Sequence, residues 1–324
     1  MDLQDRLTIL IPTYNRKERL LGTLHSIASQ GHWGEYDVVI VDNCSNYSVE
    51  EAIKEEFVDD FSKSVTVHRW FFNTGMSTNI SIAFEFVRTK WCWFISDDDE
   101  ILEGALDTIL KDTKRYAQKI AVKYSIKDIC NYDNSELSNV HEWASYYLSH
   151  PSGDKGYLSM LYNVSILYPF LQALTVHSYS YLSFWLPVLL ALNETKTGMI
   201  MSSDLLFKYK SNNDGWSSSD ERYLNTLLGI RTLFDFRYGL PPKTFCAFKR
   251  VFVEDLFNAK PVVLRIVSLP ERQSRQHYYD LLKSYFSGSI VDVLLSKIFF
   301  YFVLLFNIPP ASVNKIIRVK NKKK

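Results

Sequence analysis

The sequence predicts an α/β fold with a doubly wound, mostly parallel sheet, followed by a helical extension at the carboxyl end. Three observations support this prediction. Short apolar runs rich in β-branched residues recur between residues 7 and 95, and segments with helical spacing separate them. Polar residues follow the runs directly, as they do where strands end at a ligand site. Strands that alternate with helices in this way form parallel sheets.

The first strand is expected at residues 7–11, an apolar run that Pro12 ends. A helix follows, because Asn15 and Glu18 have the spacing of a capping box and apolar residues recur at helical spacing over residues 20–28. Gly31 ends this helix. The later elements, in order, are strand 38–41, helix 49–57, a strand that begins at 65–67, helix 78–87, strand 91–95 and a helix around 102–110.

The composition places the chain among folded globular proteins. Of its 324 residues 47% are hydrophobic and 23% are charged, and the length suffices for two domains or for one domain with a large appendage. The formal net charge of +1 gives no basic field, so no nucleic acid partner is expected. The four cysteines are scattered without metal-ligand spacing and residues 1–6 are polar, so we expect a reducing compartment, no signal peptide and a cytoplasmic location.

An acidic triplet, Asp97, Asp98 and Asp99, follows the strand predicted at 91–95 with only Ser96 between them. Three adjacent carboxylates repel one another, and a divalent cation held jointly with the phosphates of a nucleotide would neutralise them. The alternative is a solvated turn whose aspartates cap the helix around residues 102–110.

The other polar residues at predicted strand ends should lie near the triplet, because the carboxyl ends of parallel strands share one edge of the sheet. They are Thr13, Tyr14, Asn15, Asp42, Asn43 and Asn73. Neither G-x-G-x-x-G nor G-x-x-x-x-G-K-[ST] occurs in the sequence. A metal is therefore favoured over a glycine loop as the group that neutralises phosphates here.

Four blocks of sequence resemble the family 2 glycosyltransferases in their order and spacing. They are ILIPTYNR at 9–16, IVDNCS at 40–45, NTG at 73–75 with Asn79, and FISDDD at 94–99. Together they cover about the first third of the chain. The resemblance implies a GT-A fold, which is Rossmann-like, with a nucleotide-sugar donor, Mn²⁺ or Mg²⁺ as cofactor, and transfer with inversion at the anomeric carbon.

The resemblance also implies roles for single residues. The donor-binding residues would be Pro12, Thr13, Tyr14, Asn15, Asp42, Asn73, Asp97 and Asp98. The nucleobase would lie against Thr13 and Tyr14 and donate a hydrogen bond to Asp42. The metal residues would be Asp97, which would hold the ribose or a water on the metal, and Asp99, which would coordinate the metal itself. Such a metal would offset charge on the departing nucleoside diphosphate.

Several of these residues have a structural alternative. Asp42 and Asn43 could form an ordinary turn after their strand, and Asn73 could likewise belong to a turn. Asn79 could be a helix-face residue and not a ligand contact. Arg16 is expected to be solvated in the first helical turn, with a phosphate contact as its alternative.

Inverting transfer requires a general base that takes the proton of the acceptor hydroxyl. The Glu-Asp pair that supplies this base in many family members has no counterpart in the middle of this chain. His177 lies near the expected position and imidazole titrates near neutrality, although a packed histidine is the alternative. Asp154 and Asp204 are the other candidates.

The second half is similar, at residues 156–159, 177–179 and 212–217, to abequosyltransferase-like members that build O-antigen and related bacterial surface polysaccharides. This similarity implies a glycan or polyprenyl-linked acceptor. Trp216 could stack on the acceptor or anchor its own loop.

An apolar run at residues 290–306 precedes a basic tail. The run is short for a spanning helix of about 20 apolar residues and carries charge near its start. An interfacial helix, on the inner face of the cell membrane, fits better than a span; a helix buried in the core and a true span remain as alternatives.

The predicted function is therefore sugar transfer in bacterial surface polysaccharide biosynthesis, such as O-antigen, lipopolysaccharide or capsule. In the chain, the donor-binding half would be residues 1–125, the acceptor-binding region residues 126–240 and the helical region residues 241–324. Two other hypotheses compete. A sugar-nucleotide nucleotidyltransferase would need a Gly-rich basic loop after the first strand, which residues 12–15 do not supply. A non-catalytic partner subunit of a membrane-associated glycosyltransferase would agree with the missing Glu-Asp pair.

Overall fold

The computed structural model of the protein describes residues 4–57, 60–150, 159–178, 183–208, 241, 243–244, 247 and 251. Asp154, Trp216, the apolar run at 290–306 and the basic tail lie outside these residues, as does most of the predicted helical extension. Within the described ranges, none of the helices has the length and apolar character needed to cross a membrane.

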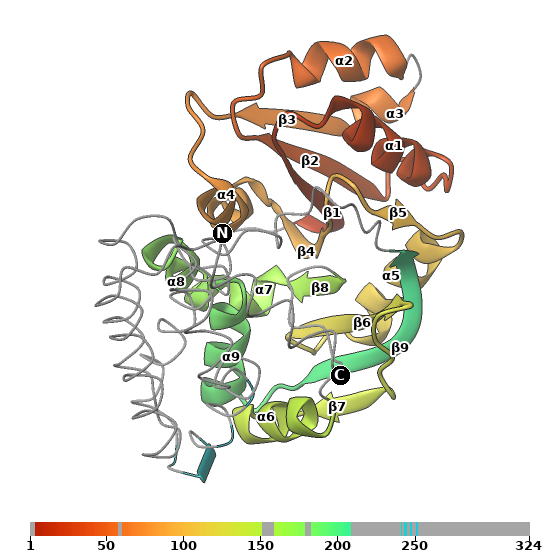
Figure 1. Cartoon of the computed structure of the whole chain (residues 1–324). Helices are drawn as coiled ribbons and strands as arrows, with labels where there is room; N and C mark the ends of the chain where they lie inside the picture. Colours follow the sequence, from red (N-terminus) through yellow and green to blue (C-terminus); the bar gives the residue numbers. More distant parts are fainter. Residues whose placement is uncertain are drawn as a thin grey trace, which may run out of the picture.

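The described strands form one mixed sheet in the order β3-β2-β1-β4-β8-β6-β9-β5, with β7 paired to β9 (Figure 1). Its parallel part contains β1 (Gln4–Thr13), β2 (Tyr36–Asp42), β3 (Val65–Arg69) and β4 (Thr89–Phe94). The chain runs outward from β1 to β3 and then returns to β4 on the other side of β1. This is the predicted doubly wound arrangement, and the strand order reverses between β1 and β4, where such sheets bind ligands.

The sheet continues beyond β4 through strands of both directions. They are β5 (Glu100–Ile101), β6 (Ala121–Lys127), β7 (Ser135–Leu137), β8 (Met160–Asn163) and β9 (Met199–Lys208). β8 runs antiparallel to both β4 and β6, while β9 is parallel to β6 and antiparallel to β5 and β7. The long β9 curves along this part of the sheet in Figure 1.

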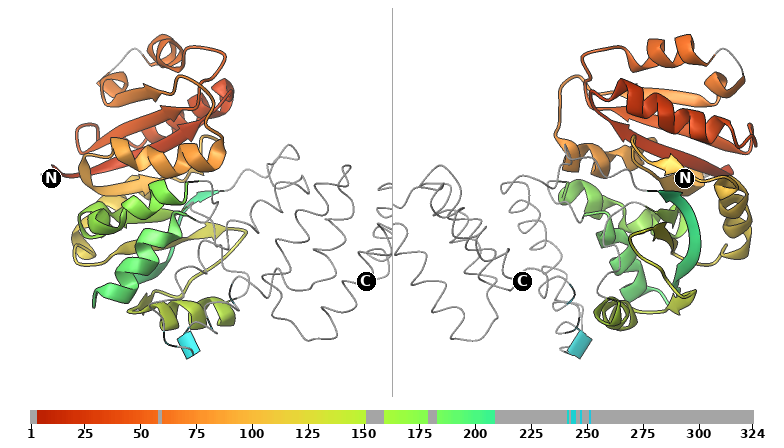
Figure 2. Two further views of the ribbon diagram at one scale, coloured as in Figure 1. Left: turned by 90° about the vertical axis from the view of Figure 1, so that its left-hand side faces the viewer. Right: turned by 45° about the vertical axis from the view of Figure 1, so that its right-hand side comes forward.

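The helices of the first part agree with the predicted elements in place and type, except for α3 (Asp60–Lys63), which was not predicted. The others are α1 (Lys17–Ala28), α2 (Val49–Glu56) and α4 (Met76–Ala83), which a 3₁₀ turn, η1 (Phe84–Phe86), continues. α1 lies over the parallel strands in Figures 1 and 2. The second part adds α5 (Ala105–Arg115), α6 (Val140–Ser149), α7 (Val164–Leu167), η2 (Tyr168–Phe170), α8 (Gln172–Val176) and α9 (Trp185–Glu194).

β4 forms the centre of the core. Its Trp91, Trp93 and Phe94, and Ile95 directly after it, are each at most 1% exposed. Burial of one such side chain contributes roughly 1.5–3 kcal/mol. The strand that carries the acidic triplet is therefore among the most firmly held parts of the described fold, which fixes where the triplet begins.

One predicted helix cap is wrong, and the alternative in which the triplet caps a helix is contradicted. Asn15 does not cap α1: the N-cap is Arg16, which makes no side-chain cap bond, and Asn15 has a φ of 54°. The Asn15 side chain instead accepts a hydrogen bond from the Asn46 amide at 2.7 Å, so a neighbouring loop uses the group that a cap would need. α5 begins after Gly104, whose φ is 75°, and the aspartates of the triplet therefore do not cap it.

Candidate active site

The polar residues after β1, β2 and β4 meet at one edge of the sheet. Thr13 is the register partner of Asp42, and the Asn43 amide donates to the Thr13 carbonyl at 2.9 Å. The Ile95 amide donates to the Leu10 carbonyl at 3.1 Å, which brings the end of β4 beside the end of β1. The triplet therefore lies at the point where the strand order reverses.

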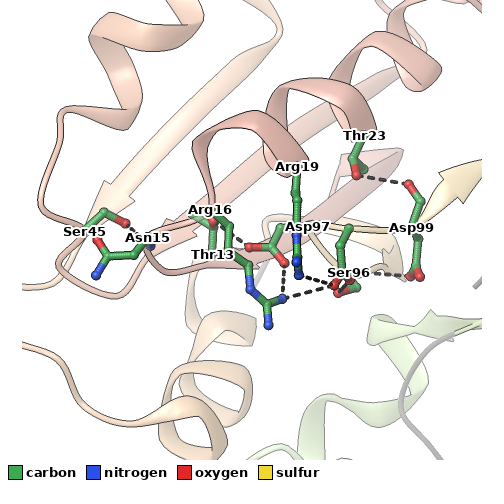
Figure 3. Close-up of polar contacts among 10 residues, drawn as sticks. Thr13, Asn15, Arg16, Arg19, Thr23, Ser45, Ser96, Asp97 and Asp99 are labelled. Carbon is green, nitrogen blue, oxygen red and sulfur yellow. Dashed lines mark hydrogen bonds and ion pairs between the residues drawn. The ribbon is translucent and has the colours of Figure 1, made fainter. Parts of the chain in front are cut away.

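Asp97 is the member of the triplet whose carboxylate contacts Thr13 of β1, and it also contacts Arg16 at the N-cap of α1 (Figure 3). It is 3% exposed; its Oδ2 accepts a hydrogen bond from Thr13 Oγ1 at 2.8 Å and its Oδ1 accepts one from Arg16 Nη1 at 2.9 Å. Burial raises the pKa of Asp97 above its ordinary value, although Arg16 and Thr13 act to lower it. This carboxylate is thus held in place from two elements far from it in the chain.

Asp98 and Asp99 turn to different surroundings. Asp98 accepts hydrogen bonds from Ser96 Oγ at 2.6 Å and from Arg16 Nη1 at 3.3 Å. Asp99 is 1% exposed; its Oδ2 accepts from the Ser96 amide at 3.2 Å, and its carbonyl accepts from Thr23 Oγ1 of α1 at 3.0 Å. Asp97 and Asp98 thus share Arg16 Nη1, whereas the Asp99 carboxylate accepts from the backbone of its own turn.

Arg16 is not simply solvated, as the sequence suggested. Arg16 and Arg19, one helical turn apart, are both about one-third exposed, and each places Nη1 near Asp98, at 3.3 Å and 3.6 Å. An open depression of about 370 Å³ is lined by residues 15–19 beside them. The guanidinium groups thus neutralise part of the charge that the triplet concentrates.

Asp42 is fully buried and organises the loop after β2. Its Oδ1 accepts from the Ser45 amide at 2.9 Å, and its Oδ2 lies 3.2 Å from Arg69 Nη1. Arg69 also donates to the carbonyls of Tyr47, at 2.7 Å, and of Ser45. Burial raises the pKa of Tyr47 to about 12, and the nearby Asp42 adds to the rise. The turn that the sequence left open as an alternative is present here.

The Asn73 segment forms the turn that the sequence offered as its alternative. Asn73 Oδ1 accepts from Asn43 Nδ2 and from the Gly75 amide, both at 2.8 Å. Asn79 is 3% exposed, with Oδ1 accepting from Trp70 Nε1 at 2.8 Å, so it packs within the fold. The residues just before Asn73 expose two large rings to solvent: Phe71 is 97% exposed and Phe72 is 65% exposed. Tyr14, after β1, is 42% exposed.

The triplet offers the donors that a hard divalent cation prefers. Among the described residues, no three His, Cys, Asp or Glu side chains come together as a metal cage. Mg²⁺ at nucleotide sites does not need such a cage, because one or two carboxylates and the substrate phosphates suffice, and carboxylates suit Mn²⁺ equally. The donor chemistry of Asp97, Asp98 and Asp99 therefore fits a cation that is shared with a diphosphate.

The candidate bases lie on other elements. His177 follows α8 as its C-cap, is half-buried, and donates its amide hydrogen to the Ala173 carbonyl at 3.1 Å. α8 packs on α4, which begins at the Asn73 turn. Asp204 lies exposed on a bulged part of β9, where its Oδ2 accepts from Ser202 Oγ at 2.9 Å.

Three arginines contact candidate site residues that sequence reasoning did not connect with them: Arg16, Arg19 and Arg69. One signal was present, since Arg16 and Arg19 are three residues apart and so share a face of the predicted helix. Arg69 had no comparable signal, because only the pairing of β2 with β3 places it opposite Asp42.

Comparison with known proteins gives consistent results. The profile described as "Glycosyl transferase family 2" matches residues 8–179. An uncharacterized glycosyltransferase of Haemophilus influenzae is 30% identical over 105 residues, or 32% of this chain and 33% of that protein. Abequosyltransferase RfbV of Salmonella typhimurium is 29% identical over 101 residues, or 31% of this chain and 30% of that protein. The match thus spans about a third of the length of these curated relatives.

The fold is also found in a solved structure. The mannosyltransferase PcManGT of Pyrobaculum calidifontis, in complex with GDP-Man and Mn²⁺, superposes with a TM-score of 0.56. The superposition covers 93% of this chain and 81% of that one, at 13% sequence identity. This likeness supports the GT-A fold, and at such low identity it bears on the fold alone.

Proposed function

The chain belongs to glycosyl transferase family 2, whose profile matches more than half of it, and on this premise we propose that it transfers a sugar from a nucleotide-sugar donor to a glycan or lipid-linked glycan. The acceptor would belong to a bacterial surface polysaccharide. One relative is an abequosyltransferase, and another is named teichoic acid poly(glycerol phosphate) polymerase. Those names support the broad class of acceptor but no particular sugar.

The observation that carries the proposal is the position of the triplet. Asp97 is bonded to Thr13 at the end of β1, and Thr13 is the register partner of Asp42 at the end of β2. A nucleotide across this edge would place its base toward β1 and β2 and its diphosphate toward the triplet. That orientation agrees with the roles proposed for Tyr14, exposed after β1, and for Asp42.

Asp97 and Asp99 would hold the divalent cation, Mn²⁺ or Mg²⁺, together with the diphosphate. When bound, the cation would offset the negative charge that develops on the departing nucleoside diphosphate. Thr13 and Ser96 would keep the carboxylates oriented, since each already donates a hydrogen bond to one of them. This preorganisation would lower the cost of arranging charge during the transfer.

His177 is our candidate for the general base, which must take the acceptor proton on the face opposite the leaving group if transfer inverts the anomeric carbon. It follows α8, which packs on α4. His177→Asn should therefore lower kcat and leave the affinity for the donor within about twofold of wild type. Loss of donor affinity, or no loss of kcat, would remove His177 from this role.

The donor can be identified by screening. A panel of UDP-, GDP-, CDP- and dTDP-sugars with Mn²⁺ should contain one that raises the melting temperature and is slowly hydrolysed, because a ligand at about 100 times its Kd stabilises the folded state by about 2.7 kcal/mol. Asp99→Ala and Asp97→Asn should abolish both effects. Glu103→Gln, an exposed carboxylate beyond the triplet, is the matched control and should retain them. If no nucleotide sugar has either effect, the proposed function is wrong.

A further inference from the structure

The acidic triplet is paired with cations supplied by α1 and its N-cap. Arg16 Nη1 lies 2.9 Å from Asp97 Oδ1 and 3.3 Å from Asp98 Oδ2, so one nitrogen bridges two carboxylates (Figure 3). Arg19 Nη1 lies 3.6 Å from Asp98 Oδ2. The carboxylates are far more buried than the arginines: the Asp97 side chain is 4% exposed and the Arg16 side chain 35%. The guanidinium groups therefore cover the triplet from the solvent side.

This pairing conflicts with a cation at the same carboxylates. A divalent ion that approached Asp97 would meet Arg16 within a few ångströms, and like charges at that range repel strongly when the site is partly buried. The repulsion falls if the guanidinium group gains an anionic partner of its own. A diphosphate is such a partner, because its oxygens match the planar, multiply donating guanidinium group.

The surroundings of the arginines suit an anion. The first turn of α1 has amide hydrogens that the helix itself cannot use, and the N-cap residue, Arg16, supplies no side-chain acceptor for them. The open depression of about 370 Å³ is lined by residues 15–19. Its lining carries three cations, Arg16, Lys17 and Arg19, against the single Glu18 carboxylate. Arg16 and Arg19 thus line the depression and also contact the triplet.

We propose that Arg16 and Arg19 form a diphosphate site that exchanges partners with the triplet. Without donor, Arg16 pairs with Asp97 and Asp98 and Arg19 with Asp98. When a divalent cation and a nucleoside diphosphate bind together, the guanidinium groups move to the diphosphate oxygens, and Asp97, released from Arg16, binds the cation together with Asp99. The diphosphate part of this inference rests on the proposed function, whereas the competition between Arg16 and the cation does not. Cation and diphosphate should consequently bind cooperatively, with the cation alone binding weakly.

The test is a titration of the full chain with Mn²⁺ alone, followed by GDP and UDP at fixed Mn²⁺, by calorimetry and thermal shift. Arg16→Gln should bind Mn²⁺ alone on the order of fivefold more tightly than wild type, because a partly exposed competing cation is gone. The same variant should bind the nucleoside diphosphate more weakly in the presence of Mn²⁺. Arg19→Gln should show the same changes to a smaller degree, since its contact with Asp98 is longer.

Lys17→Gln is the matched control. Lys17 is exposed on the same turn and lines the same depression, but among the described residues it makes no ion pair with the triplet. Removing its charge should leave Mn²⁺ affinity within about twofold of wild type, since exposed charges interact weakly. If the gain in Mn²⁺ affinity is equal for Arg16→Gln and Lys17→Gln, the gain comes from the loss of any nearby positive charge and not from the loss of the Arg16 ion pair, and the proposal is wrong.

Other outcomes also decide the matter. Weaker or unchanged Mn²⁺ binding by Arg16→Gln, or no Mn²⁺ binding by any of the proteins, would overturn the exchange. Should Arg16→Gln fail to fold, Arg19→Gln carries the same prediction and the same refutation. If Arg16→Gln gains Mn²⁺ affinity but no protein binds GDP, UDP or another nucleoside diphosphate, then the proposed function fails while the competition between Arg16 and the cation stands.

Discussion

Arg69→Ala should destabilise the fold mainly through the carboxylate that it leaves behind. Asp42 is 0% exposed, and its Oδ2 has Arg69 as its charged partner at 3.2 Å. Removal of one member of a fully buried ion pair costs about 3–5 kcal/mol. The Arg69 side chain is 44% exposed, so water can replace part of what is lost, and we expect a cost of about 2 kcal/mol.

A double-mutant cycle separates this effect from the other contacts of Arg69. Asp42→Asn keeps an oxygen that can accept from the Ser45 amide but removes the buried charge. In that background Arg69→Ala should cost only about 1 kcal/mol, for the lost hydrogen bonds to the Tyr47 and Ser45 carbonyls. The coupling energy between Asp42 and Arg69 should therefore be about 1 kcal/mol or more.

The assay is urea denaturation followed by tryptophan fluorescence. The free energies of unfolding are compared at one common m-value, the slope of that free energy against urea concentration. Arg6→Ala is the control, because Arg6 and Asp37 also form an ion pair, at 3.0 Å, but each side chain is 36% exposed. It should cost at most about 1 kcal/mol. Additivity of Asp42→Asn and Arg69→Ala within about 0.5 kcal/mol would refute the claim that the buried charge is what Arg69 stabilises.

Three further predictions concern other parts of the described fold. Thr13→Val should cost about 1–3 kcal/mol by urea denaturation, since it removes a 2.8 Å hydrogen bond to the buried Asp97 carboxylate. The hydrogen bond that His32 donates to the Glu35 carboxylate raises the pKa of His32 above 6.5. The contribution of this pair to stability is therefore complete below pH 6.5 and disappears as the pH rises through the raised pKa. The stability difference between wild type and His32→Gln should accordingly shrink from pH 6 to pH 8. Phe71→Ser, at a ring that is 97% exposed, should change stability by less than about 0.5 kcal/mol.

Each of these has a clear contrary result. A Thr13→Val protein as stable as wild type would mean that Asp97 does not depend on the Thr13 hydroxyl. A difference for His32→Gln that grows or stays constant between pH 6 and pH 8 would contradict the raised pKa. A large loss of stability in Phe71→Ser would show that the ring is packed in solution.

The parallel part of the fold could be predicted because its signals are local. The runs that form β1, β2 and β4 are apolar and short, and the polar residues that follow them indicate one edge of the sheet from the sequence pattern alone. The triplet could be placed for the same reason. Its carboxylates follow a strand whose residues are buried, so the end of that strand fixes their position.

The parts that could not be predicted depend on contacts between distant segments. Asn15 has the local pattern of a cap, yet the loop after β2 takes its side chain through the Asn46 amide. Arg16 pairs with Asp97 across 81 residues of sequence, which no helical pattern reveals. β8 is only four residues long, and its place between β4 and β6 follows from antiparallel pairing with both.

Binding of nucleoside diphosphates with and without Mn²⁺, measured by calorimetry on wild type and Asp99→Ala, tests the central claim most directly. The account predicts that at least one of UDP, GDP, CDP and dTDP binds wild type much more tightly with Mn²⁺. It predicts that Asp99→Ala, which removes a buried carboxylate of the triplet after β4, eliminates this dependence on the metal. Binding that is equally tight without Mn²⁺, or that is unchanged in Asp99→Ala, would contradict the assignment of the triplet to a metal–diphosphate site.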